Sequence, residues 1–104
     1  MIRVKYDIDD DANYTYLSIK GHAEFADYGK DLICASVSSI AFGLMNALDE
    51  ITGVKITELN DHIEIINGSG SPKANDFMEL ALIQLKTIEE SYGEFIKVER
   101  KQDI

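Results

Sequence analysis

Hydrophobic and polar residues alternate over the start of the chain, as they do in a β-strand with one buried face. The apolar members of this pattern are Ile2, Val4, Tyr6 and Ile8. A polar turn over residues 9–13 follows, and a second strand-like run covers residues 14–19. We therefore predict that the chain opens with a β-hairpin.

Beyond residue 31 the spacing of apolar residues changes to three and four, which predicts an amphipathic helix. Its apolar stripe consists of Ile33, Val37, Ile40, Leu44, Leu48 and Ile51. Gly53 stands where a helix C-cap glycine is expected. A second helix is predicted from Phe77, Leu80, Ala81, Ile83, Leu85 and Ile88. Ser71 is its expected cap, Pro72 lies in its first turn and Gly93 marks its end.

Three short β-type runs complete the pattern, at residues 54–57, 62–66 and 94–99. The predicted order is β-β-α-β-β-α-β, with no internal repeat or linker. We interpret residues 1–104 as a single α+β domain, in which two helices pack on one face of a mainly antiparallel sheet. The other face, or an edge of the sheet, is then open to a partner.

The charge of the chain narrows the classes of partner. Ten Lys and Arg residues stand against 19 Asp and Glu, a formal net charge of −9. This charge predicts no direct binding to nucleic acid, which needs a basic face. It favours attraction to a basic protein or peptide. No run approaches the about 18 apolar residues of a membrane helix, so no membrane partner is expected.

The single cysteine, Cys34, and His22 are the candidates for chemistry. One cysteine cannot form an internal disulfide, which favours the cytoplasm. Cys34 lies at the edge of the predicted buried face. Asp31 is the expected N-cap, with Cys34 three residues later, where the helix dipole favours a thiolate by about 0.3–1 kcal/mol. That lowers the thiol pKa by less than one unit, so full activation needs a base such as His22.

Two other interpretations of these residues stay open on chemistry alone. A lone cysteine at a helix start is commonly a small buried residue, and a histidine after a strand is commonly a surface residue. No metal or cofactor site is expected. The acidic run from Asp7 to Asn13 has Ala12 where a calcium loop needs glycine, and no paired spacing supports zinc ligands.

A resemblance favours the catalytic interpretation. Gly21-His22-Ala23, followed by the run DLICASVSS over residues 31–39, resembles the signature of the ribosomal-processing cysteine protease (Prp) family. The resemblance extends over nearly the whole chain, including the closing residues 91–99. It implies a metal-free, homodimeric cysteine endopeptidase that removes the N-terminal extension of a protein of the large ribosomal subunit.

The resemblance also implies roles for individual residues. Cys34 is the expected nucleophile and His22 the general base. Gly21, Asp31 and Ser38 are the expected supporting positions. The expected substrate loop includes Glu24, Phe25, Asp27, Tyr28 and Gly29. Ser36 stands where the family usually has alanine or glycine.

Several alternatives remain at this point. The chain could instead be a non-enzymatic acidic adaptor that binds a basic ribosomal protein, with Cys34 merely packed. Asp31 could cap the helix or orient His22, and Ser38 could contact the thiol or permit close packing. Backbone N–H groups near Cys34 are expected to hold the oxyanion. Phe42 and Met45, outside the main stripe, are candidates for a dimer interface.

Overall fold

The computed structural model describes residues 1–21 and 30–101, and of residues 30 and 31 it describes the backbone. The order of elements is β-β-α-β-β-α-β, as predicted. The elements are β1 (Ile2–Ile8), β2 (Tyr14–Lys20), α1 (Lys30–Leu48), β3 (Val54–Glu58), β4 (His62–Asn67), α2 (Pro72–Tyr92) and β5 (Ile96–Arg100).

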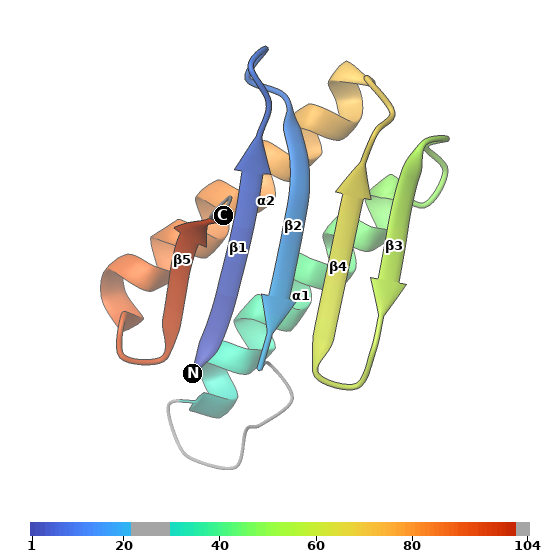
Figure 1. Ribbon diagram of the computed structural model, residues 1–104. Coiled ribbons are helices and arrows are strands. Elements are labelled where there is room, and N and C mark those ends of the chain that lie inside the picture. The colour runs from blue at the N-terminus through green and yellow to red at the C-terminus, as the bar shows by residue number, and fades with distance from the viewer. Residues whose placement is uncertain (22–29, 102–104) are drawn as a thin grey trace.

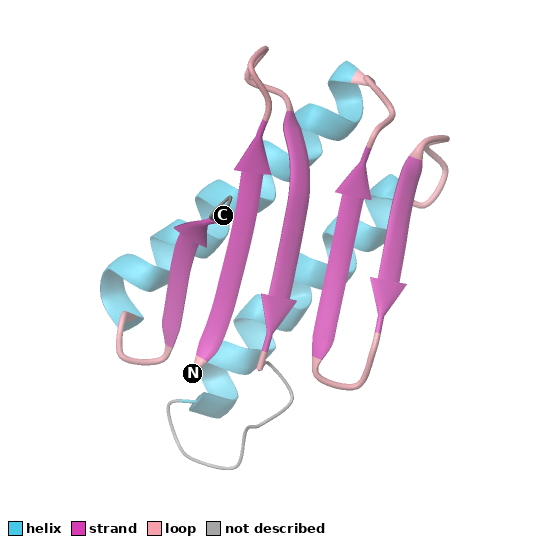
Figure 2. Ribbon diagram, viewed as in Figure 1, coloured by secondary structure: helices cyan, strands magenta, loops and turns pink. Residues whose placement is uncertain are grey.

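The described strands form one sheet in the order β3-β4-β2-β1-β5. Every neighbouring pair is antiparallel except β1 and β5, which run parallel. Both helices lie on the same face of this sheet, behind it in Figure 1, and the other face is open. Figure 2 shows the same two layers by type of element. The predicted α+β class, with two helices on a mainly antiparallel sheet, is confirmed.

The core lies between the sheet and the two helices. Alternate residues of the strands face inward, so that Ile2, Val4, Leu17, Ile19, Ile63, Ile65 and Ile96 are almost fully buried. Ile33, Val37 and Leu48 of α1 and Met78 and Leu85 of α2 meet them from the helical layer. Each such side chain stabilises the fold by about 1.5–3 kcal/mol through burial.

The ends of α2 follow the prediction. The Ser71 side chain accepts a hydrogen bond from the backbone N–H of Ala74 at 3.3 Å, and Pro72 is the first helical residue. The helix ends at Tyr92 and Gly93 is its C-cap. Neither described helix has the combination of length and apolar character that a membrane span requires.

The ends of α1 differ from the prediction. The helix begins at Lys30, so Asp31 is its second residue and not its N-cap. It ends at Leu48, and Gly53, with φ of +94°, lies in the turn before β3. Gly53 therefore does not cap the helix. A tight turn requires a left-handed glycine just as a helix C-cap does. At Gly53 any other residue would also place its Cβ 2.8 Å from the Cα of Ser69.

Met45 belongs to the core, which corrects its interpretation as an interface residue. It is 9% exposed, whereas Phe42 is 45% exposed. A helix that packs on a sheet buries a stripe wider than one row of side chains, and Met45 lies within that width.

Candidate active site

Cys34 is the fifth residue of α1 and is half-buried. Ser38 lies one helical turn later, and its Oγ is 3.7 Å from the Sγ of Cys34. Either atom can donate in this weak sulfur contact. Ser38, predicted as a supporting position, thus lies beside the thiol, while Ser36 donates its hydroxyl to the Leu32 carbonyl in its own helix at 3.0 Å.

The row of α1 side chains that contains Cys34 runs into the core. Cys34 and Ser38 are half-buried, Ala41 is buried and Met45 follows it inward. This burial anchors the helix beneath the thiol, while Cys34 itself keeps partial contact with solvent. The predicted position of Cys34 at the edge of the buried face is therefore confirmed.

The position of Cys34 in α1 changes the expected electrostatics of the thiol. The first four N–H groups of a helix have no acceptor within it, and in α1 these come before Cys34. The N–H of Cys34 thus lies just beyond those groups, and the role of the backbone N–H groups near Cys34 in holding an oxyanion stays a prediction. The dipole effect also weakens beyond the first turn. Activation of the thiol consequently depends more on a neighbouring base than the sequence suggested.

Gly21 ends the second strand in a conformation that requires glycine. Its φ is +88°, and an added Cβ would lie 2.7 Å from the carbonyl oxygen of Met1. Its N–H donates to the carbonyl of Asp61 at 2.9 Å. The end of β2 is thereby fixed between the start of β1 and the β3–β4 turn, immediately before position 22 in the chain.

The chain leaves β2 and enters α1 at the same end of the molecule (Figure 1). Gly21 and Cys34 are the two expected site positions that mark this end. His22 and the expected substrate loop, with Glu24, Phe25, Asp27, Tyr28 and Gly29, lie outside the described residues, as does the side chain of Asp31. Among the described residues, no three His, Cys, Asp or Glu side chains gather as metal ligands.

A hollow of about 300 Å³ lies beside Gly21, and no sequence pattern indicates it. Met1, Arg3, Lys20 and Asp61 line it together with Gly21. These residues are far apart in sequence and come together only through the order of the strands. Two basic side chains and one acidic side chain thus lie next to the point where the chain continues to His22.

The sequence model of the family described as "Cysteine protease Prp" matches residues 1–97 of this chain. The chain belongs to this family. The ribosomal processing cysteine protease Prp of Staphylococcus aureus (strain Mu50) is 30% identical, over 97% of this chain and 100% of the relative. The Bacillus subtilis (strain 168) protein of the same name is 32% identical, over 75% of this chain and 78% of the relative.

Solved structures of the family have the same fold. The S. aureus ribosomal processing protease Prp in complex with a substrate peptide is similar with a TM-score of 0.86 and 30% identity, over 97% of this chain and 100% of that one. The S. aureus protease with a covalently linked product peptide has a TM-score of 0.83 and 31% identity. The resemblance noted in the sequence therefore holds for both the sequence and the fold.

Proposed function

We propose that this protein is a cysteine endopeptidase that removes the N-terminal extension of a large-ribosomal-subunit protein, with Cys34 as nucleophile. One observation carries the assignment of the residue: the chain belongs to a cysteine protease family and has one cysteine. A cysteine protease without a second cysteine has no other thiol to use. The covalently linked product peptide in the S. aureus relative is the kind of species that a nucleophilic mechanism forms.

The proposed reaction has two stages. His22 accepts the thiol proton as the sulfur of Cys34 attacks the scissile carbonyl, and it returns that proton to the leaving amine. The C–N bond breaks and a thioester remains on Cys34. Water then attacks the thioester, loses a proton to His22 and releases the new carboxyl end, while the thiol is restored.

The supporting residues act on this pair. Since Asp31 is not the N-cap of α1, orientation of His22 is the role that we propose for it. Ser38 supports the thiol through its 3.7 Å contact, and Gly21 directs the chain toward His22. Glu24, Phe25, Asp27, Tyr28 and Gly29 are the residues that we propose for contact with the substrate. The acidic side chains, which outnumber the basic ones, suit a basic ribosomal extension wherever they face it, because opposite charges speed the encounter.

Mass spectrometry of a candidate substrate tests the activity. The organism's own ribosomal protein with its N-terminal extension is mixed with the enzyme, untreated or alkylated at its one cysteine by iodoacetamide and freed of excess reagent. We expect one defined cut that only the untreated enzyme makes. An intact substrate that binds both forms would instead identify the acidic adaptor, which the family membership does not favour.

Replacement of His22 by alanine tests the general base. Loss of a positioned base is expected to slow cleavage roughly 10²- to 10⁴-fold and to slow alkylation of Cys34 at neutral pH. Added imidazole is expected to restore part of both rates, since it replaces the lost base. A variant that alkylates as fast as the original protein would contradict the role of His22.

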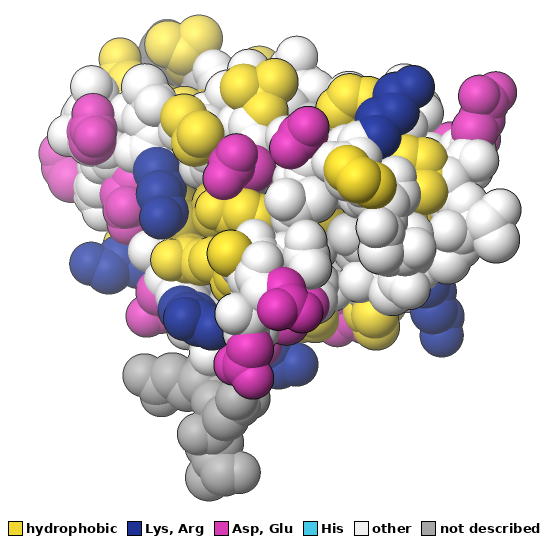
Figure 3. All heavy atoms as spheres, turned by 90° about the horizontal axis from the view of Figure 1, so that it is seen from above, with side chains coloured by type: hydrophobic (Ala, Val, Ile, Leu, Met, Phe, Trp, Pro, Cys, Tyr) yellow, Lys and Arg dark blue, Asp and Glu magenta, His cyan; other side chains and the backbone are white. Residues whose placement is uncertain are grey.

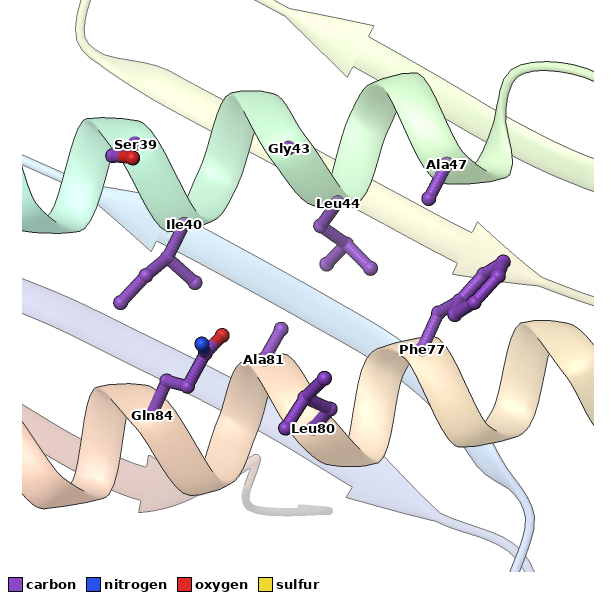
Figure 4. Close-up of a pocket in the computed structure, with 9 residues that line it drawn as sticks. All are labelled: Ser39, Ile40, Gly43, Leu44, Ala47, Phe77, Leu80, Ala81 and Gln84. Atoms are coloured by element: carbon purple, nitrogen blue, oxygen red, sulfur yellow. The ribbon is translucent and has the colours of Figure 1, made fainter.

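A homodimer and a cytoplasmic location complete the proposal. Ribosomal proteins are assembled in the cytoplasm, where thiols remain reduced. For the second copy we propose the outer surface of the helix pair. A groove of about 270 Å³ runs between α1 and α2, with Ile40 and Leu44 on one side and Phe77 and Leu80 on the other (Figure 4). Leu80, which lines this groove, and Ile83, three residues later on α2, each expose about half of their surfaces, as does Phe42 elsewhere on α1.

Charge introduced on this surface is expected to separate the protomers. The variant Leu80→Glu/Ile83→Glu places two carboxylates in the proposed apolar interface, and sedimentation velocity is expected to show a monomer. Leu59→Glu is the matched control, because Leu59 is as exposed but lies in the β3–β4 turn. A control that also dissociates, or an original protein that is already monomeric, would contradict the proposed surface.

A further inference from the structure

The open face of the sheet is basic, although the chain as a whole is acidic. Alternation along the strands turns six exposed cations to this face: Arg3, Lys5, Lys20, Lys55, Lys97 and Lys101. Three half-buried carboxylates accompany them, those of Asp7, Glu64 and Glu99. These nine side chains carry a net charge of +3, and since the chain total is −9, the rest of the chain carries −12. One further carboxylate, that of Asp61 in the β3–β4 turn, lines the hollow beside Gly21 with Arg3 and Lys20.

Three of these cations form one row across the sheet. Lys97 is the register partner of Arg3, and Arg3 is the partner of Lys20. The row continues to His62 on β4, the partner of Lys20. Neighbouring strands are about 4.8 Å apart, and like charges directly opposite each other destabilise a sheet. The repulsion between the cations of such a row is reduced when an anion binds along it.

The carboxylates on this face are already engaged. Asp7 accepts a hydrogen bond from Arg100 at 3.0 Å, which lowers the pKa of that carboxyl. Glu64 accepts from the Tyr16 hydroxyl at 3.0 Å, and Glu99 lies 4.0 Å from Arg3. Within the described part of the chain, Lys20 and Lys97 have no carboxylate within ion-pair distance. Two members of the row thus keep their charge available.

The surface along the row is hollowed. One hollow, of about 300 Å³, is the one beside Gly21, and a second, of about 310 Å³, is lined by Lys5, Tyr16, Ser18 and His62. Arg3 and Lys20 line both of them. Lys101 lies over the Tyr16 ring at 4.2 Å from its centre, so that a cation and an aromatic ring adjoin the second hollow.

The acidic remainder of the chain does not cancel this basic face. A helix is about 10 Å across, so carboxylates on the outer side of the helical layer are farther from the face than the Debye length of about 8 Å at physiological salt. Other surfaces are mixed: at the end that carries the β1–β2 turn, acidic, basic and hydrophobic side chains are interspersed (Figure 3). A ligand on the open face therefore experiences mainly the charges of that face, in which cations outnumber carboxylates.

We propose that this face binds the phosphate groups of single-stranded RNA, with Arg3 and Lys20 at the centre of the contact. Evenly spaced phosphates match a row of cations, and an aromatic ring among basic side chains suits unpaired bases. The total charge had suggested no contact with nucleic acid, but that expectation treats the charge as evenly spread. The choice of RNA rests on the proposed function, since a ribosomal protein is assembled on RNA.

Fluorescence anisotropy with a labelled oligouridylate of about 12 nucleotides tests this proposal. The variant Arg3→Gln/Lys20→Gln removes two cations from the row. Lys73→Gln/Lys86→Gln removes the same charge from α2 and serves as the control. We expect the first variant to bind RNA about tenfold more weakly than the control and to show a salt dependence shallower by roughly one unit of log K per log salt. Thermal melting checks that each variant folds, and the first should melt no lower than the original protein.

Three results would overturn the proposal. Equal RNA affinity of the two double variants would mean that RNA binding does not depend on the open face. Binding of a labelled poly-glutamate peptide, but not of the RNA, would identify an acidic polypeptide as the partner. Absence of RNA binding even at low salt would exclude the site. None of these measurements requires peptidase activity, so failure here and failure of the proposed function are distinguishable.

Discussion

Replacement of Cys34 by alanine is expected to lower the rate of substrate cleavage by a factor of roughly 10⁴–10⁶. The alanine variant has no group that can form the thioester, and the proposed mechanism offers no alternative nucleophile. The fold should be little affected, because Cys34 is half-buried and alanine is a good helix former. Cleavage is measured as the released extension by mass spectrometry, and substrate binding should persist.

The matched control for Cys34 is Ser38→Ala, one turn along the same row of α1. It removes the 3.7 Å contact to sulfur but leaves the thiol. We expect its cleavage rate to fall far less than that of the alanine variant at position 34. If the Cys34→Ala protein cleaved within tenfold of the original, Cys34 would not be the nucleophile. If both variants lost activity equally, the contact of Ser38 with the thiol would be as essential as the thiol itself.

Replacement of Gly21 by alanine is expected to destabilise the fold by about 2–4 kcal/mol. Left-handed backbone costs an L-residue about 1–2 kcal/mol, and a Cβ placed 2.7 Å from the Met1 carbonyl must displace backbone. For a domain of this size the loss corresponds to a fall in Tm of roughly 10–20 °C. Thermal melting followed by circular dichroism measures it.

Gly70→Ala separates the two contributions at Gly21. Gly70 also has a positive φ, +67°, but an added Cβ there meets nothing within 4 Å. We expect this control to lose only the conformational part, about 1–2 kcal/mol. Equal losses of stability at the two positions would show that the contact with the Met1 carbonyl does not add to the destabilisation at Gly21. Since Gly21 directs the chain toward His22, its variant should also cleave more slowly at temperatures where it remains folded.

The secondary structure could largely be predicted because its signals are local. Alternation in Ile2–Ile8, Ser71 before Pro72 and Gly93 after the last apolar residue each report on their own neighbours. The prediction of where α1 ends was wrong because that signal is also local. Ile51 continues the three- and four-residue spacing, but it lies in the turn after Leu48 and packs against the core from there. Periodicity alone cannot distinguish an apolar residue in such a turn from one in a further helical turn.

The resemblance supplied the candidate site residues, but no sequence pattern could predict what surrounds them. The resemblance identified Cys34 and Ser38, and the structure places the two side by side. The Met1 carbonyl against Gly21 and the row from Lys97 through Arg3 to Lys20 depend on which strands are neighbours. No sequence pattern reports that the first and last strands pair in parallel. The net charge of the whole chain therefore did not indicate that the open face is basic.

The parallel pairing of β1 with β5 also has a consequence for biosynthesis. β1 lies inside the sheet, between β2 and β5, and Ile96 of β5 is fully buried. While the residues around Ile96 are still inside the ribosome, β1 has no neighbouring strand on the β5 side, and the core lacks the side chain of Ile96. A nascent chain shorter than about residue 100 should therefore stay incompletely folded. We expect the enzyme to become competent only after β5 has emerged.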